Sequence, residues 1–452
     1  MWYLVYNGLL LLASPIILLV LLAKKRCRRG LLQRFGLESP SRVSGRPNTP
    51  DRPVIWVHAV SLGEVMAVVP LVKELHRRHP DHRFLVSTVT ETGREAVEQR
   101  LADVAEHRYA PLDFSWVVNK VIGRWQPSLY IFVETELWPN LLRALRRERV
   151  PTVLVNGRLS SKSYARQQWG PVRSFYRTML QMVSLCLMQS DRDVERMVSL
   201  GADARLVRRT GNIKFDQPMP ELSSPGLSRS QLGVQDHEQL LVAGSTHPVE
   251  EDALVTAYRR IVTVCPSAVL LIAPRHIERV GQVEAMIREQ GFPVQRRSAF
   301  QKNVAVPGTG PRVVILDTRG ELPSVYREAA VAFVGGTLVP IGGHNLLEPA
   351  VWGKPVLFGP YTDHCAEVAD LLTQGAGGVR VADVEALTEQ VTRLLNNAIV
   401  RERMGQAARK VIQQNQGALQ RTIEALETVF GQNRDGSGSS RERRAVPLMV
   451  GQ

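Results

Sequence analysis

The stretch WVHAVSLGEV (56–65) places a potential acid–base residue directly after an apolar segment. Ser61 followed three residues later by Glu64 is the pattern of a capping box, in which two side chains satisfy the first backbone donors of a helix. A carboxylate at the mouth of a cleft can instead take a proton from a reacting hydroxyl group. These ten residues leave both roles open for Glu64.

Polar loops recur where the predicted strands end. Ligands of open parallel sheets bind outside the carboxyl ends of the strands, so these loops are candidate binding segments. Turn chemistry explains any one of them, but eight such loops on one edge favour a binding site. They cover residues 61–64, 90–94, 134–140 and 156–160 in the first half of the chain, and 244–251, 274–278, 317–322 and 335–348 in the second half.

The segment GGHNLLEPAVWGKPVLFGP (342–360) has the features of a nucleotide site. Asn345 is suited to cap a helix over 346–352, whose free N–H groups would bind a phosphate. The glycines before it allow the backbone to approach a ligand, and Glu348 could accept hydrogen bonds from ribose hydroxyls. A capped helix of an α/β unit is the alternative interpretation, which accounts for Asn345 but not for the glycines.

Three basic residues suit an anionic ligand. Arg275 and His276 follow an apolar strand, and the planar fork of an arginine pairs well with phosphate or carboxylate. Lys214, in GNIKFD, comes just before a predicted linker and is expected where two domains meet. A solvent-exposed arginine and a solvated lysine are the alternatives for these positions.

No metal or redox centre is predicted. His58, His247, His276 and His344 are dispersed along the chain, and the sequence contains no HxxEH motif. The four cysteines are scattered singly, as in proteins that keep reduced thiols in the cytosol. We therefore expect a reaction that uses neither a metal nor a cofactor.

Apolar runs that alternate with helical patterns predict two parallel sheets, each covered by helices on both faces. A segment rich in proline, serine and glycine after Asp216 separates the two sets of runs. We expect two Rossmann-like α/β domains facing a cleft, preceded by one membrane-anchor helix. The expected parts are an anchor (1–23), a basic connector (24–52), a first domain (53–215), a linker (216–238), a second domain (239–430) and a disordered tail (431–452).

The amino-terminal stretch 2–23 carries no charge and is long enough to span a bilayer. Five Lys and Arg residues follow within 24–29, which predicts a single-pass anchor with the rest of the chain on the cytoplasmic side. Trp2, Tyr3 and Tyr6 would then lie at the opposite interface. Pro15 interrupts the run, so a buried or interfacial helix is the alternative.

The net charge of +14 indicates anionic partners. Aromatic residues are not interleaved with the basic clusters, and no nucleic-acid motif occurs, so membrane lipid is expected as a partner and nucleic acid is not.

The loops taken together resemble those of the Kdo transferases, which attach 3-deoxy-D-manno-octulosonic acid to lipid A precursors in lipopolysaccharide synthesis. The resemblance lies in SLGE, ETELWPN, NGRLS, GNIKFD, GSTHPVEE, APRHIER, GELP and GGTLVPIGGHNLLEPA, in this order from the anchor to about Phe430. It implies a GT-B fold, CMP-Kdo as the donor substrate, an inverting mechanism without a metal, and an inner-membrane enzyme with an amino-terminal anchor.

The resemblance also implies roles for individual residues. Glu64 would be the catalytic base, and Glu134 and Lys214 would stabilise the transition state. The contacts with CMP would come from Arg275, His276, Arg319, Gly320, Glu321, Asn345, Leu346, Leu347 and Glu348.

Two other classes of protein remain open at this stage. A sugar-nucleotide epimerase or a lipid-linked UDP-sugar transferase would share the phosphate site, and CMP would not compete with its donor. A membrane-bound nucleotide-binding scaffold without activity would tolerate changes at Glu64 and Lys214.

Overall fold

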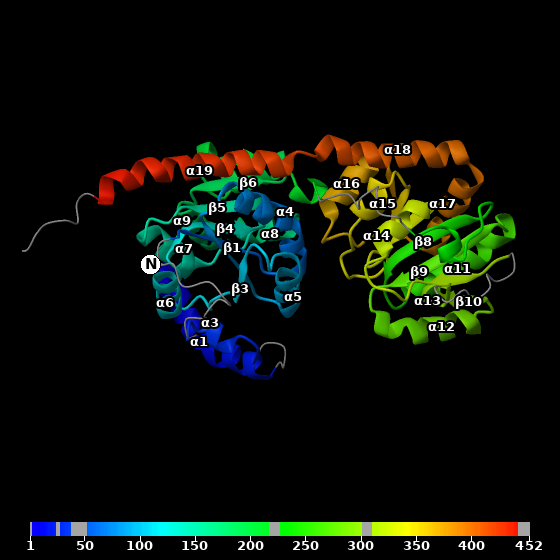
Figure 1. Cartoon of the computed structure of the whole chain (residues 1–452), viewed down its shortest axis with the longest axis horizontal. Helices are drawn as coiled ribbons and strands as arrows, with labels where there is room; N and C mark the ends of the chain where they lie inside the picture. Colours follow the sequence, from blue (N-terminus) through cyan, green and yellow to red (C-terminus); the bar gives the residue numbers. More distant parts are fainter. Residues whose placement is uncertain (1, 24–27, 38–51, 217–226, 301–309, 442–452) are drawn as a thin grey trace, which may run out of the picture. The chain divides into compact units, whose positions relative to one another are not determined.

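The computed structural model describes residues 2–23, 28–37, 52–216, 227–300 and 310–441. The chain divides into two compact units (Figure 1). The first comprises Met1–Gln217 and Gln416–Gln452, and the second comprises Pro218–Asn415. Each contains a seven-stranded sheet, which confirms the expected pair of Rossmann-like domains. The cleft between them stays a prediction. Most of the expected connector, part of the linker (217–226) and the end of the tail (442–452) lie outside the described residues.

The strands of the first unit form one parallel sheet in the order β3-β2-β1-β4-β5-β6-β7. Ile55 and Val57 of β1 face one buried cluster and Trp56 faces another, so both faces of the sheet are covered and the strand reads as a continuous apolar run. The strands are β1 (Val54–His58), β2 (Arg83–Thr88), β3 (Glu106–Tyr109), β4 (Pro127–Val133), β5 (Thr152–Gly157), β6 (Leu185–Met188) and β7 (Val207–Arg209).

Helices connect these strands, as parallel pairing requires, and further helices precede β1 and end the chain. They are α1 (Trp2–Ala23), α3 (Leu31–Arg34), α4 (Leu62–Arg78), α5 (Glu91–Arg100), α6 (Ser115–Trp125), α7 (Pro139–Arg147), α8 (Ser161–Gln167), α9 (Gly170–Leu180), α10 (Asp191–Ser199) and α19 (Ala418–Arg441), with the 3₁₀ turns η1 (Ala204–Leu206) and η2 (Ile213–Asp216).

The carboxyl-terminal helix α19 packs on the first unit, which differs from the expected domain bounds. The carboxylate of Asp216 accepts hydrogen bonds from the backbone N–H groups of Gly417 and Leu419, each at 2.6 Å. Leu426 is buried in the same cluster as the β1 side chains. The second unit therefore ends at Asn415 rather than at 430. The helix is described as far as Arg441, which lies in the segment whose composition predicts a disordered tail.

The second unit repeats the architecture with a parallel sheet in the order β10-β11-β9-β8-β12-β13-β14. Its strands are β8 (Gln239–Thr246), β9 (Ala268–Pro274), β10 (Val294–Arg296), β11 (Val313–Ile315), β12 (Val331–Val334), β13 (Val356–Phe358) and β14 (Gly378–Arg380). Its helices are α11 (Glu250–Val264), α12 (Val280–Glu289), α13 (Arg297–Phe300), α14 (Leu322–Val325), α15 (Leu347–Val351), α16 (Ala366–Gln374), α17 (Val384–Asn396) and α18 (Ala398–Asn415), with η3 (Ser230–Leu232), η4 (Ile277–Arg279) and η5 (Tyr326–Glu328).

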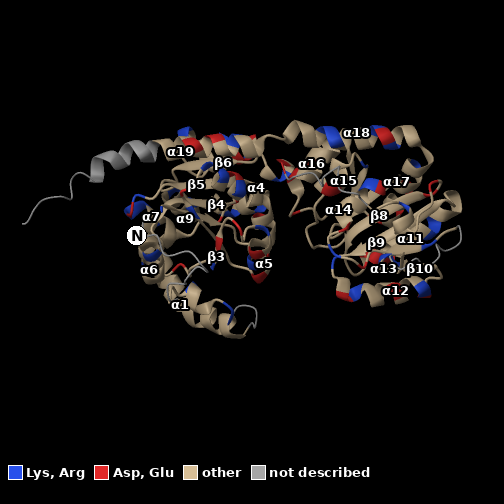
Figure 2. Ribbon diagram, viewed as in Figure 1, with Lys and Arg blue, Asp and Glu red and all other residues tan. Residues whose placement is uncertain are grey.

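Helix α1 covers the predicted anchor segment and, by length and composition, can cross a membrane. The ribbon of α1 is tan in Figure 2, because the helix contains no Lys, Arg, Asp or Glu. The indole of Trp2 donates to Ser174 at 3.1 Å and the hydroxyl of Tyr6 donates to Asp113 at 2.9 Å. The amino end of the helix therefore contacts the first domain, whereas the sequence places these aromatic residues at the far side of a bilayer.

Candidate active site

Glu64 and Glu134 border the point of the first sheet where the strand order reverses. β1 pairs with β2 on one side and with β4 on the other, and ligands of such sheets bind at this switch point. Glu64 lies in the first turn of α4, and Glu134 directly follows β4. The sheet therefore brings two of the three expected catalytic residues to the same edge.

Glu64 is buried without an ion pair among the described residues. Its side chain is 8% exposed, and its two oxygens accept hydrogen bonds from the N–H of Val60 at 2.8 Å and from the hydroxyl of Ser61 at 2.9 Å. Burial raises the pKa of Glu64 from 4.5 to about 7 in spite of these bonds, and the charges of Glu134 and Glu136 also raise it. A carboxylate with a pKa near the working pH is well suited to general-base catalysis.

The capping box expected from SLGE forms in a modified way. Ser61 is the N-cap residue of α4, but its side chain accepts no hydrogen bond from the helix backbone. Its hydroxyl donates to Glu64 instead, and Glu64 accepts from the N–H of Val60. These contacts fix the orientation of the carboxylate, so a helix-terminal role and a catalytic role are compatible in one side chain.

Ser61→Ala is expected to move the pH dependence of the reaction. If Glu64 is the catalytic base, it works when it is deprotonated, and activity should rise as the pH passes through about 7. Removing a hydrogen bond to the charged form raises the pKa of Glu64, by about one unit for a bond worth about 1.5 kcal/mol. A profile of kcat/KM against pH should therefore shift to higher pH and regain most of its activity there. An unshifted profile would show that Ser61 does not act through Glu64.

Glu134 is held between two cations. The Nζ of Lys214 lies 3.3 Å from one carboxylate oxygen, and the Nε of Arg158 lies 3.4 Å from the other. The backbone of Glu134 has a φ of 58°, a left-handed conformation that costs a non-glycine residue about 1–3 kcal/mol and is often found at functional sites. Sequence reasoning named Lys214 and Glu134 but missed Arg158, although the loop NGRLS that contains it was a candidate.

Buried amide side chains fix the turn that carries Lys214. The side-chain oxygen of Asn156 accepts from the N–H of Ile213, and that of Asn212 accepts from the N–H of Lys214, both at 3.0 Å. The Asn212 amide in turn donates to Gln189 at 3.2 Å. The lysine is thus positioned by the interior of the domain, which explains why polar residues surround it in the sequence.

The second unit has a polar cavity of about 370 Å³ at the carboxyl ends of β9 and β11. Arg275, His276, Arg319 and Gly320 line it, so four of the expected CMP contacts lie together. The guanidinium of Arg275 has no hydrogen-bond or ion-pair partner within the described part of the chain, whereas Arg319 pairs with Glu278 at 3.2 Å. An unpaired arginine beside a cavity is available for an anionic ligand.

The loop after β11 was expected to contact CMP through Arg319, Gly320 and Glu321, and only part of it is placed to do so. Gly320 has a φ of 81° and open space where a Cβ would lie, so its backbone is accessible. The carboxylate of Glu321 instead accepts a hydrogen bond from Thr318 and lies 3.5 Å from Arg297. Glu321 is therefore engaged within the protein, and it is not among the residues that line the cavity.

The segment 345–348 also differs from its sequence interpretation. Asn345 accepts from the N–H of Leu347 at 3.1 Å and donates to Glu348 at 3.2 Å, but α15 begins only at Leu347 and has five residues, too few for a strong helix dipole. The side chains of Leu346 and Leu347 are buried, so only their backbone can contact a ligand. Burial raises the pKa of Glu348 to about 7, while the charge of Arg275 lowers it.

The glycine-rich loop before Asn345 also has a role in the packing of the domain itself. A Cβ at Gly335 would come within 2.5 Å of the carbonyl oxygen of Ser245, so this glycine permits the close approach of the loops after β12 and β8. The buried carboxylate of Glu250 then accepts from the backbone N–H groups of His247, Gly336, Thr337 and Leu338, at 2.7–3.0 Å. These loops flank the switch point of the second sheet, because β8 pairs with β12 and with β9.

Three histidines that are dispersed in the sequence meet at this switch point. The Nε2 atoms of His247 and His344 are 2.8 Å apart, and the ring of His276 lies 5.8 Å from that of His247. Burial lowers the pKa of His344 to about 4, and the neighbouring His247 and Arg275 act in the same direction. Sequence spacing could not reveal this cluster. Within the described residues, no group of His, Cys, Asp and Glu is arranged to hold a metal ion.

The two sheets, with polar loops at their carboxyl ends, define a protein of the GT-B class. The UDP-GlcNAc 2-epimerase from Neisseria meningitidis, crystallised with UDP-GlcNAc, has this fold, with a TM-score of 0.58, 15% identity, and coverage of 83% of this chain and 100% of that chain. The sequence model of the 3-deoxy-D-manno-octulosonic-acid transferases (kdotransferases) matches residues 29–217.

Two proteins named 3-deoxy-D-manno-octulosonic acid transferase are similar over nearly the whole chain. That of Haemophilus influenzae is 35% identical over 439 residues, 96% of this chain and 100% of its own. That of Bordetella pertussis is 32% identical over 428 residues, 92% of this chain and 97% of its own. The chain therefore belongs to the Kdo transferase family and is a glycosyltransferase, which confirms the resemblance carried by the loops.

Proposed function

We propose that this enzyme transfers Kdo from CMP-Kdo to a lipid A precursor, lipid IVA, with inversion and without a metal or other cofactor. The reaction would take place at the cytoplasmic face of the inner membrane during lipopolysaccharide core synthesis. The observation that carries the proposal is a set of three ionisable groups at the first switch point: a buried Glu64 with a pKa of about 7 beside the ion pair of Glu134 and Lys214.

Glu64 supplies the base that an inverting transfer needs. Its carboxylate takes the proton of the acceptor hydroxyl while the hydroxyl oxygen forms a bond to the anomeric carbon of Kdo. The bond from this carbon to the CMP phosphate breaks, and the phosphate leaves with the electron pair. The hydrogen bonds from Val60 and Ser61 hold the carboxylate in one orientation for this step.

Cationic groups offset the negative charge that this reaction gathers. The donor carries a carboxylate at its anomeric carbon, the departing CMP gains charge on its phosphate, and the acceptor is itself a phosphorylated lipid. Lys214 and Arg158 present positive charge at the first switch point, and Arg275 presents it at the cavity of the second unit. Preorganised charges of this kind are usually the largest contribution to catalysis.

The cavity of the second unit is assigned to the CMP part of the donor. Arg275 would pair with the phosphate, and the open backbone at Gly320 would let the nucleotide approach closely. Asn345 and Glu348, which are bonded to each other in the structure, would meet the ribose hydroxyls. The test of the proposed function is the mass of the product formed from CMP-Kdo and lipid IVA.

A further inference from the structure

The amino end of helix α1 is tied to the first domain by hydrogen bonds and ring contacts. At the amino end, the side-chain amides of Asn7 and Asn140 form two reciprocal hydrogen bonds, at 3.0 and 2.8 Å. The rings of Trp2, Tyr3 and Tyr6 surround Phe175 of α9 with centroid distances of 5.9–6.2 Å. Arg143 of α7 lies over the ring of Tyr3 at 4.8 Å.

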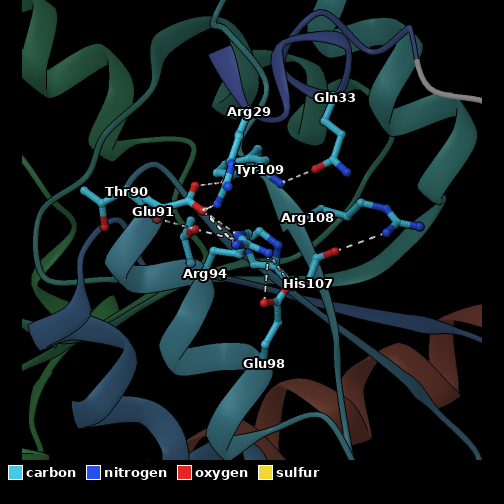
Figure 3. Close-up of polar contacts among 10 residues, drawn as sticks. Arg29, Gln33, Thr90, Glu91, Arg94, Glu98, His107, Arg108 and Tyr109 are labelled. Carbon is cyan, nitrogen blue, oxygen red and sulfur yellow. Dashed lines mark hydrogen bonds and ion pairs between the residues drawn. The ribbon is translucent and has the colours of Figure 1, made fainter. Parts of the chain in front are cut away.

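The segment that follows the helix is attached to the same domain. Arg29 pairs with Glu91 at 3.0 Å, and Gln33 accepts from the backbone N–H of Tyr109 at 2.9 Å (Figure 3). Arg34 donates to the carbonyl oxygen of Val89 at 2.7 Å. Burial opposes ionisation of Glu91, but the hydrogen bonds from Tyr109, Arg94 and Arg29 lower its pKa to about 2, so this ion pair is charged at neutral pH.

A helix whose amino end is fixed to the first domain cannot place that end on the far side of a bilayer from the domain. Its 22 residues extend about 33 Å, which is the full thickness of a hydrocarbon core. A spanning orientation would separate residues 2–7 from α7 and α9, and would leave the amides of Asn7 and Asn140 without the partners they have here.

The helix has one face on the domain and one apolar face in solvent. Residues 2, 3, 6, 7, 10, 13, 14, 17 and 21 are half-buried, at the three- and four-residue spacing of a helix stripe that faces the protein. The opposite face is exposed and apolar, with Leu4, Val5, Leu9, Leu11, Leu12, Ile16, Leu18, Leu19, Val20 and Leu22 each 43–81% exposed. Such a contiguous patch marks a surface for a membrane or a partner.

A backbone carbonyl that Pro15 leaves without its helical N–H donor is satisfied within α1, as an apolar environment requires. Pro15 lacks the N–H that would bond to the carbonyl of Leu11, and the hydroxyl of Ser14 donates to that carbonyl instead, at 2.7 Å. Neighbouring elements add exposed apolar side chains. Leu32 lies in α3, Leu37 follows it, and Trp116 of α6 stacks on Phe35 with a centroid distance of 6.2 Å.

We propose that α1 lies in the plane of the membrane, between the first domain and the acyl chains of one leaflet, and does not span it. The occupant of its exposed face is the bilayer itself. Charge complementarity supports this choice, because Lys24, Lys25, Arg26 and Arg28 follow the helix in the sequence, and anionic headgroups attract such a basic run. The inference concerns the mode of attachment and does not depend on the sugar that the enzyme transfers.

Depth-dependent fluorescence quenching tests this inference on the full-length protein. Leu4→Cys, Leu12→Cys and Leu19→Cys, each in a background with Cys27→Ser and Cys365→Ala, are labelled with an environment-sensitive fluorophore. The labelled protein is mixed with vesicles of phosphatidylethanolamine and phosphatidylglycerol, whose acyl chains carry quenchers at known positions. All three labelled sites are exposed, so the substitutions should leave the fold intact. A label at Ile399→Cys, exposed on α18, is the matched control and should not be quenched.

An in-plane helix predicts the same shallow depth at all three positions, about 5–10 Å below the headgroups. A spanning helix would instead place Leu12 near the midplane and separate Leu4 from Leu19 by about 22 Å along the membrane normal. That pattern would overturn the proposal. Absence of quenching at all three sites would also overturn it, because the face would then be covered by something other than lipid, such as a second copy of the chain. The measurement needs no donor or acceptor, so its failure is distinct from failure of the proposed transfer.

Discussion

Replacing Glu64 by glutamine is expected to lower kcat for sugar transfer by about 10²- to 10⁴-fold while the protein folds normally. Glutamine keeps the shape of the side chain and can still accept from Val60, but it cannot take a proton. Folding raises the pKa of Glu64 from 4.5 to about 7, so its contribution to stability is complete below pH 4.5 and is lost as the pH rises through about 7. Glutamine avoids this loss, and the Tm of the variant at pH 8 should equal or exceed that of the wild type.

The matched control for this prediction is Glu95→Gln, the same isosteric change at an exposed carboxylate of α5. It should leave kcat unchanged. Affinity for CMP should survive in both variants, because the donor cavity belongs to the second unit. Wild-type turnover in Glu64→Gln would exclude Glu64 as the base. Its role would then be limited to the hydrogen bonds at the start of α4.

Lys214→Met should lower kcat by about 10²- to 10³-fold, the usual effect of removing one preorganised charge from a transition state. The substitution keeps most of the aliphatic stem but leaves Glu134 with Arg158 as its remaining ion-pair partner among the described residues. Because the charge of Glu134 already raises the pKa of Glu64, the rate profile of the variant should also shift to higher pH.

Steady-state kinetics over a pH range, together with calorimetric titration of CMP, check this prediction. Lys120→Met, a change at an exposed lysine of α6, is the control and should behave like the wild type. A loss of CMP affinity as large as the loss of rate would contradict the assignment, since Lys214 would then be needed for donor binding and not for the chemical step.

The alternation of apolar runs and polar loops was enough to predict both sheets and the edge on which candidate residues gather. Strands buried on both faces read as continuous apolar segments, and β1 and β4 are clear examples. The edge strands β3, β7, β10 and β14 were missed because they are short and partly polar, as strands with one free edge often are.

The details of the site depend on tertiary structure that spacing cannot encode. No local pattern indicates that Glu134 has a positive φ or that Arg158 reaches it. The pKa of Glu64 follows from burial that outweighs two hydrogen bonds, and only the folded domain decides that balance. Some polar loops that were candidates for binding instead stabilise the fold. In the loop 90–94, Thr90 caps α5 and Glu91 forms an ion pair with Arg29.

The most direct test of the account is the mass of the product formed by the full-length enzyme from CMP-Kdo and lipid IVA in lipid vesicles. We expect lipid IVA to gain one or more Kdo units, with CMP released, and we expect the same mixture with Glu64→Gln to form little product. Added CMP should inhibit the reaction, whereas UDP at the same concentration should not. Lipid IVA that stays unmodified by the folded wild-type enzyme, or that is modified from a UDP-sugar in place of CMP-Kdo, would contradict the proposed function.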